Sequence, residues 1–163
     1  MRVVGIDPGL ATIGIGVIEA PSPDTLSVVE WLTLETPAGL PLAERLQEIL
    51  RDLRKFLAET KPDLAVVEKL FFSTNERTAF DVAHARGVIL LAVAEHGIPL
   101  LEPTPGELKS CITGDGAADK RQIQEMLVRM LKLNDVPKPD DAADALALAA
   151  YGALQQQKVH LLA

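Results

Sequence analysis

Four carboxylates in the sequence stand at positions from which they could form one metal site. Asp7 follows a short apolar run near the N-terminus, and Glu68 ends a second such run; Asp141 and Asp144 lie in an alanine-rich stretch. Oxygen ligands without His or Cys suit Mg²⁺. Two such ions about 4 Å apart can activate a water molecule and stabilise the leaving oxygen of a phosphodiester. The residue types therefore indicate phosphodiester hydrolysis, provided that the fold brings them together.

Two of the carboxylates are expected at the ends of neighbouring strands. Residues 2–6 (RVVGI) predict a short buried strand that ends at Asp7, and residues 63–68 (DLAVVE) predict another. The pattern of residues 42–61 between them is that of an amphipathic helix, and a crossover through this helix makes the two strands parallel. Parallel neighbours end at the same edge of a sheet, which places Asp7 beside Glu68.

The other two carboxylates are expected on one face of the last helix, predicted over residues 140–151. Asp141 and Asp144 are three residues apart, and this spacing puts them on one helix face. The residues around them are alanines, so the helix can lie close to the sheet and bring both carboxylates to the same pocket.

The remaining pattern predicts an α/β fold with a mixed sheet flanked by helices. Strands over residues 12–19 and 26–34 are joined by short connections, which favours antiparallel pairing with the first strand. Gly14 and Gly16 allow a neighbouring backbone to approach closely. Helices are also expected over residues 75–95 and 120–133, with a strand at 98–101 and a helical turn from Pro105 toward Lys109.

Each carboxylate also has a purely structural interpretation. Asp7 could begin an Asp-Pro-Gly turn, and Glu68 could be a solvated strand end. Asp140 or Asp141 could cap the last helix after Pro139; Asp140 is the natural N-cap, and we assign it that role. An acid ending each of two buried strands, together with a pair on one helix, is much harder to produce by accident.

The composition predicts one domain without a membrane segment. The chain has 163 residues, 48% of them hydrophobic, which suffices for a single core. Its first residues lack the features of a signal peptide, and no apolar stretch is long enough to cross a bilayer. Cys111 is the only cysteine, which excludes an internal disulfide and a Cys-rich metal site. We therefore expect a soluble, cytoplasmic protein.

The net charge of -7 argues against a nucleic-acid partner, because such domains normally carry a basic surface. Divalent cations would neutralise part of the acidity if the carboxylates shared one pocket. Residues 101–138 hold as many acids as bases, so no basic stripe is visible. Affinity for DNA would then rest on a few placed contacts and on metal, and would fall with salt.

Five segments, in order, span nearly the whole chain: GIDPGLATIGIGVIE (5–19), VVEKLFFSTN (66–75), ARGVILLA (85–92), LKS…GDGAADKRQIQEML (108–127) and DDAADALALAA (140–150). This ordered set resembles the RuvC family of Holliday-junction resolvases. The resemblance implies a ribonuclease H-like nuclease domain over residues 1–155, with a mixed five-stranded sheet, and we expect residues 156–163 to form a flexible tail. It also implies a homodimer that nicks junctions symmetrically with Mg²⁺, or Mn²⁺ in its place, and leaves 5′-phosphates. RuvA and RuvB are the implied partners.

The resemblance assigns the metal ligands to Asp7, Glu68, Asp141 and Asp144. Some members carry His where Asp141 stands, so the carboxylate here implies an all-oxygen site, which we expect to hold two ions per subunit. Phe71 matches a Phe that contacts bases at the junction centre. Lys109 and Lys120 match two functionally important lysines. These three residues are thereby implied to bind DNA.

Structural alternatives stay open for the DNA-binding candidates. Phe71 could stack on a base or pack in the core, and the neighbouring Phe72 would then point the opposite way. Lys109 and Lys120 would be ordinary surface lysines without the family match. Arg77 and Arg86, on the helix over residues 75–95, could touch DNA or a partner subunit, but surface solvation is the default interpretation. We expect this helix, with its many small and apolar residues, to form the dimer surface.

Three other functions are compatible with parts of the pattern. Asp7-Pro8-Gly9 also resembles the phosphate loop of actin-like and sugar-kinase ATPases, but those proteins need two such domains and a longer chain. A ribonuclease H acting on RNA-DNA hybrids would lack the segment around Phe71 and the paired lysines. A junction-binding module without activity would have no need of clustered carboxylates, which cost stability without a cation.

Overall fold

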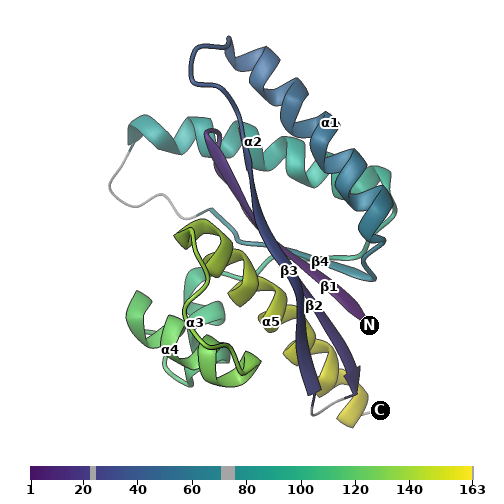
Figure 1. Cartoon of the computed structure of the whole chain (residues 1–163), viewed down its shortest axis with the longest axis vertical. Helices are drawn as coiled ribbons and strands as arrows, with labels where there is room; N and C mark the ends of the chain where they lie inside the picture. Colours follow the sequence, from purple (N-terminus) through teal and green to yellow (C-terminus); the bar gives the residue numbers. More distant parts are fainter. Residues whose placement is uncertain (23–24, 71–75, 163) are drawn as a thin grey trace.

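A mixed sheet lies at the centre of the molecule (Figure 1). The structure is a computed structural model that describes residues 1–22, 25–70 and 76–162. Its five strands in this part of the chain have the order β3-β2-β1-β4-β5. Their bounds are β1 (Arg2–Asp7), β2 (Thr12–Ser22), β3 (Thr25–Glu35), β4 (Leu64–Val67) and β5 (Leu100–Leu101). The predicted antiparallel pairing of β1, β2 and β3 is confirmed, and so is the parallel pairing of β1 with β4.

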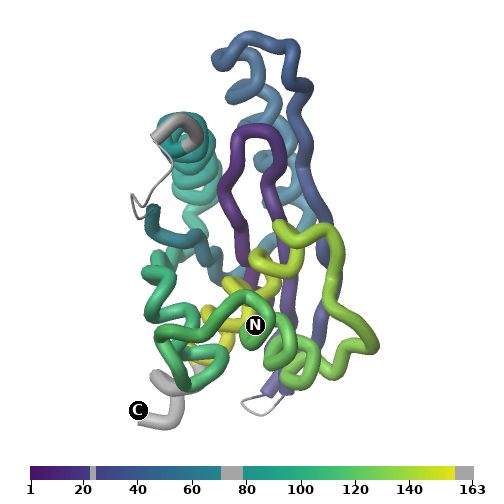
Figure 2. The backbone as a smooth tube through the Cα atoms, turned by 90° about the vertical axis from the view of Figure 1, so that its left-hand side faces the viewer, coloured from purple at the N-terminus to yellow at the C-terminus, as the bar shows by residue number. Residues whose placement is uncertain are grey.

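Helices cover both faces of this sheet (Figure 1). α1 (Leu42–Thr60) and α2 (Glu76–Glu95) pack on one face against Val4 and Ile6 of β1. α3 (Pro105–Thr113), α4 (Lys120–Leu131) and α5 (Asp140–Leu162) pack on the other face against Val3. Successive side chains of a strand point to opposite faces, so the apolar residues of β1 contribute to a core on each side of the sheet. In Figure 2, α3 and α4 (green) lie below and α1 (blue) above, at opposite ends of the sheet.

α5 lies in direct backbone contact with β1 and β2. A Cβ atom added at Gly14 would lie 1.9 Å from the carbonyl oxygen of Asp141, and one added at Gly5 would lie 2.0 Å from that of Ala145. Only glycine fits at such a distance. The close approach that we expected at Gly14 is therefore made by the first turn of α5. This helix carries two of the four carboxylates, Asp141 and Asp144.

Strands β2 and β3 are longer than expected and β5 is shorter, and three helix boundaries also differ from the sequence-based expectations. The turn expected from Pro105 to Lys109 is a helix that continues to Thr113, and α4 ends at Leu131, where Lys132 takes a left-handed conformation. The prediction that the last helix ends at Tyr151 is wrong, because α5 continues to Leu162. Beyond Tyr151 the chain goes on packing against the sheet through buried residues such as Ala153. The flexible tail at residues 156–163 stays a prediction.

None of the described helices is both long and apolar enough to cross a membrane.

Candidate active site

Asp7 and Glu68 project from equivalent positions of adjacent parallel strands. Asp7 ends β1 and Glu68 directly follows β4, and the register pairs Ile6 with Val67, one residue before each acid. Strand alternation puts Asp7 on the same face as Val3, which is the face that α5 covers. The same alternation brings Glu68 to this face. The predicted juxtaposition of the two acids thus follows from pairing and alternation together.

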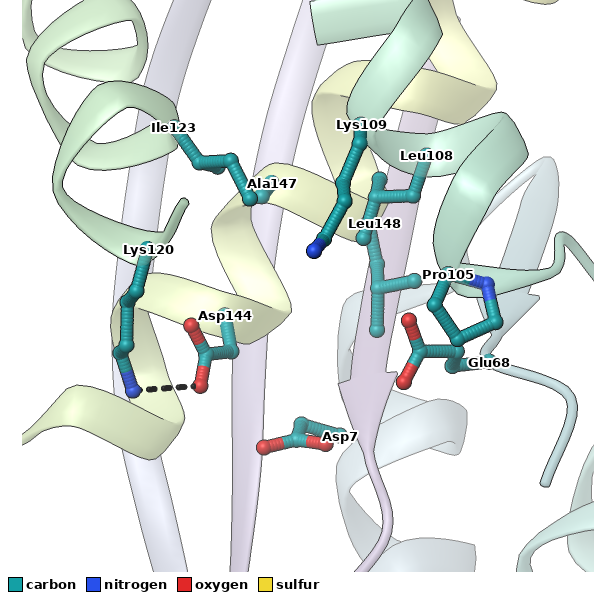
Figure 3. Close-up of a pocket in the computed structure, with 10 residues that line it drawn as sticks. All are labelled: Asp7, Glu68, Pro105, Leu108, Lys109, Lys120, Ile123, Asp144, Ala147 and Leu148. Carbon is teal, nitrogen blue, oxygen red and sulfur yellow. Dashed lines mark hydrogen bonds and ion pairs between the residues drawn. The ribbon is translucent and has the colours of Figure 1, made fainter. Parts of the chain in front are cut away.

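Three of the predicted carboxylates line one cavity of about 280 Å³: Asp7 from β1, Glu68 from the end of β4 and Asp144 from α5 (Figure 3). Lys109 of α3 and Lys120 of α4 line it too. The rest of the lining is mostly apolar and comprises Pro105, Leu108, Ile123, Ala147 and Leu148. Five separate elements therefore bring charged groups to one place.

The electrostatics of Asp7 are those of a crowded anionic site. Burial is the main cause that raises its pKa to about 7, and the negative charges of Asp144, Glu68 and Asp141 add to the rise. The positive charge of Lys120 opposes the rise. A group in this setting is ionised at neutral pH only in part unless additional positive charge is supplied.

The other two acids of the cavity experience the same environment. Burial raises the pKa of Glu68, with a further rise from Asp144, and Lys109 opposes it. Burial also raises the pKa of Asp144, against the effect of its hydrogen bond from Lys120. Each acid is thus destabilised in its charged form, which is the condition that a bound divalent cation relieves.

Asp141 lies beside this cavity and does not line it. Its charge contributes to the raised pKa of Asp7, so the two groups are electrostatic neighbours. In the described part of the chain, no three carboxylate, His or Cys side chains converge closely enough to bind one ion as they stand. Asp144 instead accepts a hydrogen bond from Lys120 Nζ at 3.0 Å. These carboxylates are oxygen donors of the kind that suit Mg²⁺.

The two predicted lysines are both part of the cavity wall and are not scattered surface groups. Lys109 extends its ammonium into the space between Asp144 and Glu68 (Figure 3). Lys120 Nζ also lies 3.2 Å from Asp140 Oδ2. Burial works against the charge of Lys120, but its bonds to Asp144 and Asp140 raise the pKa of the ammonium overall. Asp140 is the first residue of α5, so the prediction that it caps the helix is wrong; its carboxylate pairs with Lys120.

Comparison with known proteins identifies the family. The model described as "Crossover junction endodeoxyribonuclease RuvC" matches residues 3–151. The chain is 48% identical over 157 residues to the crossover junction endodeoxyribonuclease RuvC of Thermotoga petrophila, which covers 96% of this chain and 94% of that protein. The chain belongs to the RuvC family. It is therefore a crossover junction endodeoxyribonuclease, as its resemblance implied.

Solved structures of Thermus thermophilus RuvC have the same fold. One superimposes with a TM-score of 0.89 at 30% identity and covers 98% of this chain and 97% of that chain. Another, of T. thermophilus RuvC in complex with a Holliday junction substrate, gives a TM-score of 0.90 at 30% identity, with 98% and 96% covered. These similarities confirm the predicted ribonuclease H-like fold with its mixed five-stranded sheet.

Two expectations for this RuvC-family chain fall on residues near the end of β4. Phe71, the predicted base-contacting residue, and its neighbour Phe72 lie outside the described residues. The side chain of Arg77 also lies outside them. The assignment of base stacking to Phe71 therefore stays a prediction.

Arg86 is a residue of this site whose place the sequence analysis missed. Surface solvation was its default interpretation, but its side chain is only 16% exposed, and its guanidinium donates to the carbonyl of Glu68 at 2.9 Å. A signal was available in the sequence. Arg86 lies three residues before Ile89 and seven before Val93, both of which are buried, so it shares the inner face of α2.

Proposed function

We propose that this RuvC-family nuclease resolves Holliday junctions as a homodimer in the cytoplasm, with Asp7, Glu68, Asp141 and Asp144 as the ligands of two Mg²⁺ ions per subunit. The observation that carries the proposal is the cavity that Asp7, Glu68 and Asp144 share although they come from three elements. Burial raises the pKa values of all three, neighbouring carboxylates raise them further, and a divalent cation would stabilise their charged forms. Function in recombination and repair, beside RuvA and RuvB, belongs to the same proposal.

Bound Mg²⁺ would supply an activated water for attack on phosphorus and would stabilise the 3′-oxygen as it leaves, and this bond cleavage leaves a 5′-phosphate and a 3′-hydroxyl. The residues of the chain prepare this chemistry. Asp7 lies on β1, the central strand, and would hold the ions together with the other acids. The apolar side chains of Leu108 and Leu148 form part of the cavity wall.

The two lysines are suited to hold the substrate. Lys120 binds Asp144 and Asp140 in the structure, and a cation on Asp144 would compete for that carboxylate. The ammonium of Lys120, which lines the cavity, would then be available to a phosphate oxygen. Lys109, whose charge acts on Glu68, can stabilise negative charge that develops on the phosphate.

A homodimer matches the symmetry of the substrate. A four-way junction has two-fold symmetry, so a C2 dimer brings two sites to opposite strands. Exposed apolar residues on α2 support this helix as the dimer surface: Phe80 is 70% exposed and Leu91 is 49% exposed. They are eleven residues apart, which is close to three helical turns and places them on the same face.

The test is junction cleavage with a synthetic mobile four-way junction and a matched linear duplex, each with Mg²⁺ or EDTA. We expect paired symmetric nicks in the junction only, and only with Mg²⁺. Asp7→Asn should abolish them. Asp52→Asn is the matched control, because Asp52 lies on α1 in an exposed pair with Arg51. Junction binding without nicks would favour a non-cutting module, and equal cutting of the duplex would contradict junction resolution.

A further inference from the structure

A partly buried ion pair lies next to the backbone of Glu68. Arg86 of α2 pairs with Glu102, which follows β5, and the two side chains are 16% and 35% exposed. The same guanidinium donates from Nε to the backbone carbonyl of Glu68 at 2.9 Å. Arg86 thus connects α2 with the carboxyl ends of β4 and β5.

The sheet itself no longer holds the chain at this point, because β4 ends at Val67. The backbone at Glu68 is fixed from two other directions. Arg86 binds the carbonyl of Glu68, and the backbone N–H of Lys69 donates to the carbonyl of Pro103 at 2.8 Å. A hydrogen bond from a charged donor is stronger than one between neutral groups. The position from which the Glu68 side chain enters the cavity is therefore set largely by Arg86.

We propose that Arg86 and Glu102 are positioning residues for metal binding, which hold Glu68 in the cavity that it shares with Asp7 and Asp144. The inference rests on the metal site proposed above. Arg86 acts through the backbone of Glu68, and Glu102 fixes the guanidinium in the orientation that this contact needs. Changes to residues that support metal ligands typically cost about 10–100-fold in metal affinity or activity.

A second arginine on the same side of the sheet offers a matched comparison. Arg54 of α1 binds Glu95 of α2 through two hydrogen bonds of 2.8 and 2.6 Å. The arginine of this pair is more exposed, at 50% against 16% for Arg86, and both of its hydrogen bonds go to Glu95 and none to Glu68. A substitution in this pair weakens a similar ion pair but leaves the hydrogen bond to the Glu68 backbone in place.

The experiment compares Arg86→Lys and Glu102→Gln with the control Arg54→Lys. Lysine keeps the charge but lacks the fork that reaches two acceptors, and glutamine keeps the shape of Glu102 without its charge. Three quantities are measured on the full chain: Mn²⁺ affinity by calorimetry without DNA, the Mg²⁺ dependence of single-turnover junction cleavage, and junction affinity in EDTA.

We expect both site variants to bind Mn²⁺ about tenfold more weakly and to need about tenfold more Mg²⁺ for half-maximal cleavage. Saturating Mg²⁺ should restore the cleavage rate, and junction affinity in EDTA should not change. Arg54→Lys should match the wild type. If both site variants keep the wild-type Mn²⁺ affinity and Mg²⁺ dependence, whatever their melting temperatures, the pair is only structural and the inference is wrong. If one variant fails to fold, the other decides.

A wild-type protein that binds no Mn²⁺ would give a different result. It would overturn the proposed metal site, and the positioning role would fall with it. If the wild type binds Mn²⁺ and both site variants bind it equally well, only the positioning role is overturned. The two failures are therefore distinguishable in the same calorimetric series.

Discussion

The two walls of the cavity hold their carboxylates in different ways. Glu68, on the β4 wall, is held through its backbone by Arg86, which is only 16% exposed. Asp144, on the α5 wall, is held through its side chain by Lys120, which is 50% exposed. Exposed ion pairs contribute little stability and are readily exchanged. We infer that the β4 wall is preformed for metal, whereas the α5 wall rearranges when a cation replaces Lys120.

The largest effect is expected when the preformed wall loses its carboxylate. Glu68→Gln keeps the size of the side chain but removes the charge of a proposed ligand, so cleavage should fall about 1,000-fold, which corresponds to about 4 kcal/mol. Single-turnover cleavage measures the loss, and junction affinity in EDTA should stay the same. Glu59→Gln on the exposed surface of α1 serves as the control. A loss of less than about tenfold would contradict a ligand role for Glu68.

Asp7 lies where the two walls meet, and its pKa predicts a dependence of stability on pH. A pKa raised to about 7 means that the folded protein holds this proton more tightly than the unfolded chain. The free energy of unfolding without metal should therefore fall as the pH rises from about 4 to 7 and then level off. At about 1.4 kcal/mol per pKa unit, Asp7 contributes at most about 4 kcal/mol to this fall.

Urea unfolding in EDTA across this pH range measures the effect. In Asp7→Asn the fall should be much smaller, and at pH 8 this variant should be more stable than the metal-free wild type. Added Mg²⁺ should stabilise the wild type most at pH 8, because protons compete with the metal at lower pH. Equal pH profiles for the two proteins would show that Asp7 is not the group responsible.

The stability of the protein should depend on the close packing of α5 against β2. Gly14→Ala places a Cβ against the carbonyl of Asp141, and relieving this contact should cost about 1–3 kcal/mol of unfolding free energy. Gly106→Ala is the control, since a Cβ there meets nothing within 4 Å; it should be at least as stable as the wild type. Chemical unfolding compares the three proteins. A Gly14→Ala protein as stable as the control would mean that α5 is not held as closely as the structure shows.

The smallest effect is expected when Lys120, whose ammonium a metal ion would displace from Asp144, is replaced. Lys120→Gln removes a competitor for Asp144 and a positive charge near the cavity. Mn²⁺ affinity should therefore rise by about threefold, a gain typical of an exposed ion pair. Cleavage should fall nonetheless, because a substrate contact is lost. Calorimetry and single-turnover kinetics separate the two effects, and weaker Mn²⁺ binding would refute the exchange of Lys120 for a cation.

The β4 wall was the more predictable part of the site. Short apolar runs and the helix between them were enough to predict parallel strands, and these place Asp7 beside Glu68. The alanines around Asp144 and the glycine at position 14 also predicted the close contact of α5 with the sheet. Local pattern sufficed because strand pairing and alternation leave few alternatives.

Other features depend on tertiary contacts that the sequence pattern did not specify. Arg86 was assigned to the surface because a charged residue on a helix is usually solvated, but Glu102 and the end of β4 lie within its reach. Asp140 was assigned as a cap because it follows Pro139, but the helix already includes it and Lys120 binds it. In both cases a partner distant in sequence determined the role of the side chain.

The most direct test of the metal site is anomalous diffraction from crystals of the protein grown with Mn²⁺. The account predicts anomalous peaks in the cavity, within coordination distance of Asp7 and Glu68, with Asp144 turned away from Lys120 toward the metal. Peaks elsewhere only, or a cavity without a peak in which Lys120 still binds Asp144, would contradict it.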